Sequence, residues 1–165
     1  MSASVGSSPE LDLIADSVHN ANARIRFFRI AYGPASMDNV IGRQEVISVL
    51  TATAQGGRFT YFWEIDTDQS RQLVRIAFLL LQCIETALPL GGEIQIANDG
   101  DSCILTGSGP RLAFDPVLWE GLINPEVQID HNASQVQFAL LPSVISDAGR
   151  KLTINQDADT IMVRF

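Results

Sequence analysis

The sequence feature that most limits the fold is a repeat of apolar residues near the start of the chain. Its spacings alternate between three and four residues, which places its members along one stripe of a helix, as in coiled coils and helical bundles. Ser8 before Pro9 favours a helix start, and Gly33-Pro34 is a typical helix stop. We therefore predict a helix over 9–33 with one stripe for packing on another helix. This stripe, the seam, consists of Leu11, Ile14, Val18, Ala21, Ile25, Phe28 and Tyr32.

The end of the predicted helix carries a second apolar face, formed by Ala23, Phe27 and Ile30. Its last turns must therefore be covered on two sides, because both faces need to leave water. The predicted organisation is a flexible lead (1–8), a bundle helix (9–33) and a body (34–165).

The body shows alternating helical and strand signals separated by glycine-rich or proline-containing turns. The predicted elements are a helix over 43–54, a strand over 59–65, a very apolar helix capped by Asp68 and running to 87, a hairpin of 93–96 and 102–106, helices over 115–122 and 134–148, and a hairpin of 151–154 and 160–165. Helices and hairpins in this order indicate an α+β sandwich whose mostly antiparallel sheet is covered on one face.

Composition excludes several classes of partner. The chain has 19 Asp and Glu against 11 Lys and Arg, for a net charge of -8, which disfavours binding to nucleic acid. Its longest apolar stretch, ending near Ile84, is shorter than the roughly 20 residues of a membrane span, and the N-terminus lacks a secretory signal. We therefore expect a cytoplasmic protein. Cys83 and Cys103 lie in apolar surroundings and are expected to be buried free thiols.

The order of elements in the body is similar to the ATP-binding domain of sensor histidine kinases, the Bergerat-type sandwich. Two stretches narrow the resemblance: 20–33 reads Asn-Ala-Asn-Ala-Arg-Ile-Arg-Phe-Phe-Arg-Ile-Ala-Tyr-Gly, and 87–92 reads Ala-Leu-Pro-Leu-Gly-Gly. Both resemble signatures of the ChpT family of histidine phosphotransferases, and the resemblance extends from about Leu11 to Phe165. It implies a homodimer built on a four-helix bundle, a degenerate kinase ATPase domain, and phosphate relay between receiver domains of a hybrid kinase and of response regulators.

The resemblance also implies that the phosphorylated histidine lies on the first helix of a two-helix hairpin, in a His-Asp motif. Nothing before Ser8 fits that helix, so the lead looks like the hairpin loop. We expect the acceptor helix to be missing, through the choice of start codon or through truncation, and the chain alone to be inactive. His19 is followed by Asn20 rather than an acidic residue and is expected to face solvent or to lie at the edge of the bundle; His131 is expected in a loop beside a helix cap. No catalytic residue is assigned.

Nucleotide binding by a kinase domain of this kind requires an Asn that holds Mg²⁺, an Asp-x-Gly-x-Gly turn for adenine, and a glycine-rich lid. Here Thr86 stands at the Asn position and Leu105 at the Asp position, although Gly107 and Gly109 remain and predict a tight turn. No Gly-x-Gly occurs within 121–134. The sequence therefore predicts no ATP, no other cofactor and no metal.

Acidic residues gather at Glu64, Asp66 and Asp68. A metal site would require them to converge on one point, which the sequence does not establish. We expect Asp68 to cap a helix and the other two carboxylates to be solvated charges at the strand end.

Basic residues concentrate at Arg24, Arg26 and Arg29, three of the eleven in the chain. They could stabilise the helix dipole, at about 0.3 to 1 kcal/mol each, or pair with carboxylates of a receiver domain. We expect at least one of these arginines to dock a receiver, with exposed parts of Phe27 and Ile30 supplying apolar contact.

Two alternatives to a histidine phosphotransferase stay open for the function of the chain. One is an ATP-binding kinase fragment, and the other is a receiver-binding or dimerisation module without chemistry.

Overall fold

The computed structural model describes residues 8–34, 39–124 and 130–165. Its first element is α1 (Pro9–Tyr32), whose start is capped by Ser8 Oγ accepting the Leu11 N–H at 3.2 Å. The helix ends at Gly33, where a Cβ atom would lie 2.1 Å from the Arg29 carbonyl oxygen. Only glycine allows that close approach, so both predicted signals at the ends of the helix are confirmed.

The body contains every helix and hairpin that the sequence predicts. Its elements are β1 (Val40–Ile41), α2 (Arg43–Ala54), β2 (Phe59–Trp63), β3 (Gln69–Ser70), α3 (Arg71–Ala87), β4 (Gly92–Asp99), β5 (Ser102–Ser108), α4 (Pro116–Ile123), a 3-10 turn η1 (Ala133–Gln135), α5 (Val136–Asp147), β6 (Thr153–Gln156) and β7 (Thr160–Arg164). The two-residue strands β1 and β3, which pair with each other, are not predicted because they are too short to show alternation.

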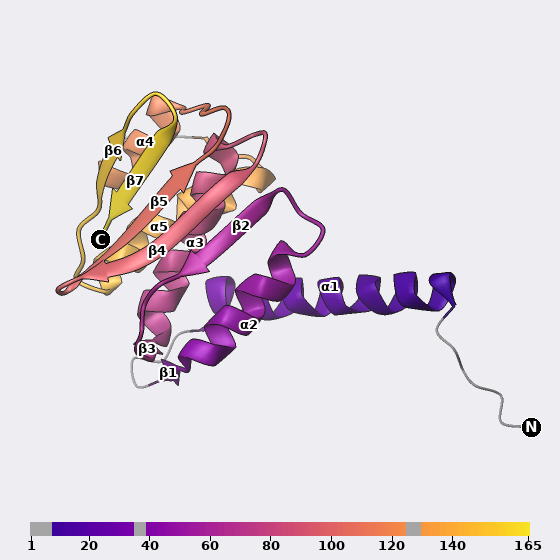
Figure 1. Ribbon diagram of the computed structural model, residues 1–165. Helices are drawn as coiled ribbons and strands as arrows, with labels where there is room; N and C mark the ends of the chain where they lie inside the picture. The colour runs from indigo at the N-terminus through magenta and orange to yellow at the C-terminus, as the bar shows by residue number, and fades with distance from the viewer. Residues whose placement is uncertain (1–7, 35–38, 125–129) are drawn as a thin grey trace, which may run out of the picture.

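Five strands form one sheet in the order β2-β4-β5-β7-β6. Only β2 and β4 are parallel; the other neighbours are antiparallel. The parallel pair needs a long crossover connection, and α3 supplies it. Helices α3, α4 and α5 lie on one face of the sheet (Figure 1), which confirms the predicted α+β sandwich.

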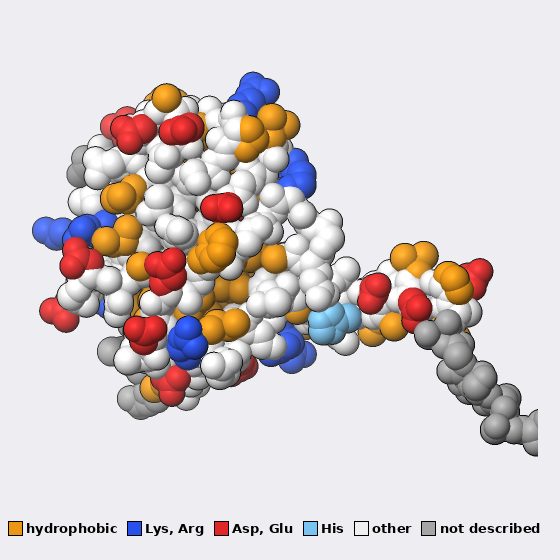
Figure 2. Space-filling view, in the orientation of Figure 1, with side chains coloured by type: hydrophobic (Ala, Val, Ile, Leu, Met, Phe, Trp, Pro, Cys, Tyr) orange, Lys and Arg blue, Asp and Glu red, His pale blue; other side chains and the backbone are white. Residues whose placement is uncertain are grey.

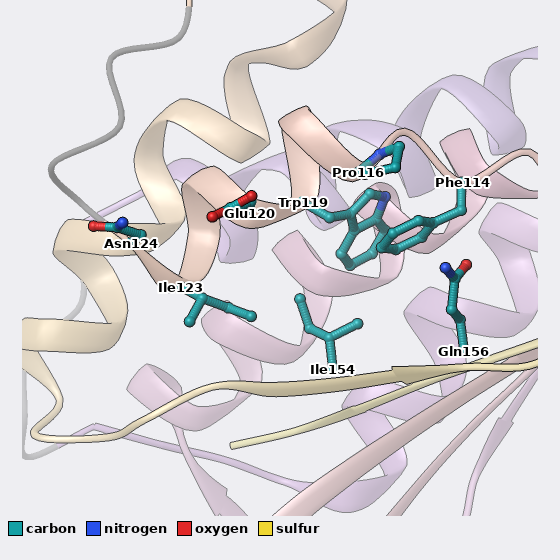
Figure 3. Close-up of a pocket in the computed structure, with 8 residues that line it drawn as sticks. All are labelled: Phe114, Pro116, Trp119, Glu120, Ile123, Asn124, Ile154 and Gln156. Carbon is teal, nitrogen blue, oxygen red and sulfur yellow. The ribbon is translucent and has the colours of Figure 1, made fainter.

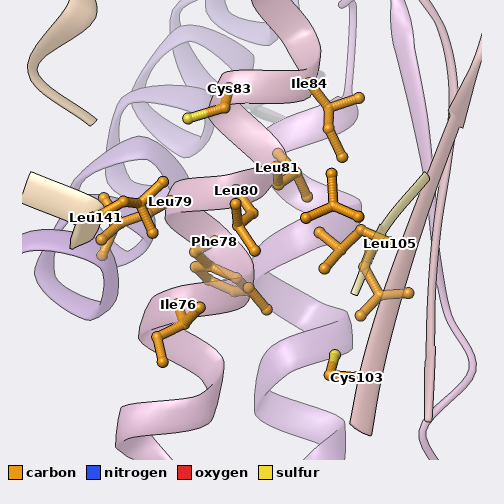
Figure 4. Packing of buried hydrophobic residues seen from close by; sticks show 14 of the residues in the cluster. Ile76, Phe78, Leu79, Leu80, Leu81, Cys83, Ile84, Cys103, Leu105 and Leu141 are labelled. Atoms are coloured by element: carbon orange, nitrogen blue, oxygen red, sulfur yellow. The ribbon is translucent and has the colours of Figure 1, made fainter. Parts of the chain in front are cut away.

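The core is organised around α3. Eleven of its 17 residues are buried, so the helix is covered on nearly all sides and its apolar run is explained. Figure 4 shows Leu79 beside Leu141 of α5, while Ile84 points toward Leu105 of the sheet. Cys83 and Cys103 are buried free thiols, as predicted, and burial raises the pKa of Cys103 to about 12.

One predicted detail near α3 is wrong. Ser70, not Asp68, caps α3: its Oγ accepts the Leu73 N–H at 3.2 Å. Asp68 instead accepts the Arg43 N–H at 2.8 Å and so caps α2 from a distant part of the chain. The physical reason is that the residue preceding α2 is Gly42, which has no side chain to satisfy that donor.

The two halves of α1 have different surroundings. The N-terminal half projects from the body, whereas the C-terminal half packs on α2 and α3 (Figure 1). There the Phe27 ring stacks on Phe78, with centroids 4.6 Å apart, and Arg75 Nε donates to the Ala31 carbonyl at 3.2 Å.

No helix in the described ranges has both the length and the apolar character that a membrane span requires.

Candidate partner-binding surface

The body leaves most of the seam of α1 uncovered. Its large apolar residues are about half exposed: Leu11 50%, Ile14 60%, Val18 54%, Ile25 50% and Phe28 47%. Ala21 is also exposed, and only Tyr32 is partly covered, with its hydroxyl donating to Gln82 Oε1 at 2.5 Å. Figure 2 shows apolar side chains along the projecting half of the helix. A contiguous exposed apolar stripe of this kind is typical of surfaces that bind a partner.

Charged residues on α1 are segregated along its length. Glu10, Asp12 and Asp16 lie on the N-terminal half, and Arg24, Arg26 and Arg29 lie on the C-terminal half, all of them exposed. Within the described part of the chain the three arginines form no ion pair and no side-chain hydrogen bond. Their guanidinium groups are therefore open to an external carboxylate or phosphate.

Phe27 and Ile30 do not belong to this exposed surface. Each is only 4% exposed and lies in the core, so the expectation that they supply contacts for docking is wrong. The reason is that they lie on the second apolar face, which α3 covers. The apolar side chains that accompany the arginines at the surface are Ile25 and Phe28.

Two adjoining cavities, of about 330 and 360 Å³, lie where α1 meets β2 and α3. The smaller reaches Arg24 and Tyr61; the larger reaches Thr86 and the buried Gln137 at the start of α5. Residues that line both are Phe28, Arg58, Phe59, Gln82 and Glu85. The seam and the arginines therefore end at a depression with aromatic walls and polar groups.

A half-buried Tyr–Glu pair lines this depression. The Tyr61 hydroxyl donates a hydrogen bond to the Glu85 carboxyl group. Burial raises the pKa of Glu85, although the bond from Tyr61 and the charges of Arg58 and Arg24 oppose the shift. Burial and the nearby Glu85 raise the pKa of Tyr61 above its ordinary value. The sequence analysis missed this pair; the signal was a single acidic residue within the apolar run of α3.

The two residues that the sequence analysis aligned with nucleotide-binding positions of kinases have different surroundings. Leu105 is fully buried, and the Thr86 hydroxyl donates to the Cys83 carbonyl at 2.6 Å. A Cβ at Gly107 would lie 2.4 Å from Ile84 Cγ2, and one at Gly109 would lie 2.3 Å from a backbone oxygen. The predicted tight turn is therefore wrong: Gly107 is inside β5 and packs on Ile84 of α3, while Gly109 lies against the backbone of Gly91 in the connection between α3 and β4.

A third cavity, of about 560 Å³, lies between α4 and β6 (Figure 3). Its walls are mostly apolar, with Phe114 and Trp119 facing Ile154, and Glu120 and Gln156 contributing polar groups. No Lys or Arg of the described residues lines it. It therefore offers no cation for a phosphate group.

The two histidines lie in separate places. His19 is exposed on the projecting half of α1, and His131 is half-buried in the loop before Asn132, which caps η1.

The described residues, 8–34, 39–124 and 130–165, contain no group of three or more His, Cys, Asp or Glu side chains that could hold a metal ion. Glu64, Asp66 and Asp68 are exposed.

Comparison with known proteins places the chain in a family. Residues 43–160 match the model of the histidine phosphotransferase C-terminal domain. The chain is 28% identical over 158 residues to the protein phosphotransferase ChpT of Brucella abortus (strain 2308), a match that covers 91% of this chain and 75% of that protein. A solved bacterial phosphotransferase is 27% identical and superposes with a TM-score of 0.75, over 96% of this chain and 80% of that one.

The fold of this chain is also similar to that of histidine kinase domains. The histidine kinase domain of a blue-light activated kinase from Erythrobacter litoralis EL346 superposes with a TM-score of 0.52 at 12% identity, over 92% of this chain and 72% of that one. That likeness concerns the fold alone. The match to the family model covers more than half of the chain, so this protein belongs to the histidine phosphotransferase C-terminal domain family.

Proposed function

We propose that this chain is the receiver-binding part of a histidine phosphotransferase in a bacterial two-component phosphorelay. Family membership supports the class of function. One observation supports the binding surface: on a single stretch of α1, exposed Arg24, Arg26 and Arg29 alternate with exposed Ile25 and Phe28. The proposed partners are the receiver domains of response regulators and of a hybrid histidine kinase.

The chemistry of this surface suits such partners. A receiver presents carboxylates around its phosphorylated aspartate, and a guanidinium group can pair with a carboxylate or phosphate through two parallel hydrogen bonds. The apolar surface of Ile25 and Phe28 can leave water in the same contact. The protein as a whole is acidic, with a net charge of -8, so these arginines are what would attract an acidic partner locally.

We further propose that the chain does not use ATP. Leu105 is buried in the core at the position where an acidic side chain would be needed to bind adenine. The Thr86 hydroxyl donates its proton to the Cys83 carbonyl of the same helix, α3. The cavity beside α4 presents no basic side chain from the described residues to hold phosphates. The ATPase-like body is then a scaffold that holds the end of α1 in place.

The phosphoaccepting histidine, in this proposal, lies on another helix that packs along the seam. The seam supports this because Leu11, Ile14 and Val18, on the projecting half of α1, are about half exposed and spaced for a helical partner. His19 is a poor acceptor candidate because its neighbour is Asn20 rather than an acidic residue. The 165-residue chain should therefore bind receivers without transferring phosphate by itself.

The experiment is to measure the binding of a purified receiver domain to the chain and to Arg24→Ala, Arg26→Ala and Arg29→Ala. Loss of a desolvated ion pair should weaken binding by about 2 to 5 kcal/mol, whereas loss of a rim charge should mainly slow association at low salt. The matched control is Arg111→Ala, an exposed arginine in the loop after β5. If all three variants bind like the parent at low and moderate salt, the docking surface is not on α1.

A second candidate is a module that binds receivers or dimerises without any chemistry. The observation that favours it is that α1 alone, with its exposed seam, can serve as an assembly surface. Incubation with a phosphorylated receiver separates the two. If a version extended by an acceptor helix takes up phosphate, the phosphotransferase role holds; if it binds receivers but stays unlabelled, the module role is correct.

A further inference from the structure

The cavity between α4 and the edge strand β6 is of a size that suits a small ligand. Its volume of about 560 Å³ lies within the range of about 300 to 1,000 Å³ that small-molecule sites occupy. In the order of the five-stranded sheet, β6 is at one edge, whereas β2, which borders the depression at α1, is at the other. A ligand in this cavity therefore need not compete with a partner on α1.

The wall of this cavity on the α4 side is aromatic and is held in place by packing. Phe114 and Trp119 stack with ring centroids 5.6 Å apart, and Trp119 meets the ring of Phe138 in α5 edge-on at 5.4 Å. Ile154 of β6 faces the first two rings across the cavity (Figure 3). The cavity therefore offers a preformed apolar surface to the ring of a ligand.

The charged side chain that lines this cavity is a carboxylate. Glu120 is exposed at the rim and takes part in no ion pair within the described part of the chain. Asp115 at the start of α4, and Asp157 and Asp159 after β6, add negative charge on either side. Since the described residues place no Lys or Arg in the lining, this site attracts a cation and repels an anion. A cation is also attracted to the face of an aromatic ring.

The strand β6 supplies hydrogen-bond acceptors at the same edge. The Asp157 N–H donates to the Thr160 carbonyl, so the alternation of an antiparallel pair turns the backbone groups of Ile154 and Gln156 away from β7. No strand of the described residues pairs with that side of β6. The carbonyl oxygens of these two residues, and the side-chain amide oxygen of Gln156, are therefore available to an ammonium group.

We propose that the cavity between α4 and β6 binds a small organic cation, consisting of an aromatic or aliphatic ring that carries one protonated amine. The ring lies against Phe114 and Trp119, and the ammonium group lies at the rim beside Glu120. A neutral ligand of the same shape gains nothing from the carboxylate, and a nucleotide or other anion is repelled by it. This site goes beyond the proposed receiver binding and does not depend on it.

The test compares three probes of nearly the same size at neutral pH and low salt: 2-phenylethylamine, a cation; 2-phenylethanol, which is neutral; and 3-phenylpropionate, an anion. NMR of the complete 165-residue chain follows the indole N–H of Trp119 and the methyl groups of Ile123 and Ile154. The amine should shift these signals saturably, with a dissociation constant on the order of 1 mM. It should bind about threefold more tightly than the alcohol and about tenfold more tightly than the anion. The indole N–H of Trp63, in β2, should not move.

Two variants with matched controls separate the roles of charge and space. Glu120→Gln should abolish the preference for the amine over the alcohol while leaving the alcohol bound as before, and Glu45→Gln, exposed on α2, should change neither. Ile123→Trp should fill the cavity and weaken all three probes several-fold. Val117→Trp, at an exposed position of the same helix outside the lining, should not.

Any of three results would overturn the proposal. The first is the absence of saturable shifts with the amine up to about 20 mM, well above the expected dissociation constant. The second is equal binding of the amine and the anion by the parent chain. The third is an unchanged preference for the amine in Glu120→Gln.

Discussion

The hydroxyl of Tyr61 donates a hydrogen bond to the carboxyl group of Glu85 and so joins edge strand β2 to the central helix α3. Burial is the main cause of the raised pKa of both groups. Tyr61 therefore stays protonated as a donor at neutral pH, and ionisation of Glu85 contributes to how stability responds to pH.

Glu85 should make the protein less stable as pH rises. Its folded-state pKa lies above the ordinary value of 4.5, so its favourable contribution is complete below that value and is lost as pH rises through the raised pKa. Glu85→Gln keeps an acceptor without a charge and should show a flatter stability profile and a more stable fold at neutral pH. Urea unfolding between pH 4.5 and 8 measures this, with Glu93→Gln on the exposed surface of β4 as control. Identical slopes for the parent and Glu85→Gln would refute the assignment.

Two adjacent phenylalanines of α1 should respond differently to the same substitution. Phe27→Ala removes a buried ring stacked on Phe78 and should cost about 3 to 5 kcal/mol of unfolding free energy. Phe28→Ala removes a half-exposed ring and should cost only about 0.5 kcal/mol, while weakening self-association. Denaturant unfolding and light scattering on both variants provide the comparison. Equal losses of stability would mean that the two faces of α1 are assigned incorrectly.

ATP with Mg²⁺ should leave the melting temperature unchanged. A ligand at 100 times its Kd stabilises a protein by about 2.7 kcal/mol, which is readily seen in thermal unfolding. The expectation follows from the buried Leu105 and the engaged Thr86 hydroxyl. An active histidine-kinase ATPase domain, assayed in parallel, is the positive control. A clear Mg²⁺-dependent shift for this chain would instead support the kinase-fragment alternative.

Restoring a kinase-like acid at position 105 should damage the fold rather than create a nucleotide site. Leu105→Asp loses apolar contacts and buries a carboxylate without a partner, so it should cost at least about 3 to 5 kcal/mol. Leu105→Met conserves volume and should cost less than about 1.5 kcal/mol. Thr86→Asn, at an exposed site, should change stability by about 0.5 kcal/mol. A stable Leu105→Asp chain that binds ATP would contradict this expectation.

Local signals in the sequence were enough to predict the elements of the fold. The cap at Ser8, the stop at Gly33 and the spacing of the seam define α1, and the same kinds of signal place α2 and both hairpins. These features depend on groups only a few residues apart, so they are decided before distant segments meet. The two apolar faces of α1 are predictable for the same reason.

Tertiary structure alone decided which of those faces is available to a partner. Phe27 and Ile30 are buried because α3 lies against them, and Phe28 is exposed because nothing in the described chain covers the seam. Likewise Asp68 caps α2 by accepting from Arg43, 25 positions earlier in the chain. Tyr61 donates a hydrogen bond to Glu85, which lies 24 positions later. Such pairs depend on how the sheet and helices pack in three dimensions, and helical or strand periodicity carries no information about the distant residue that a side chain will contact.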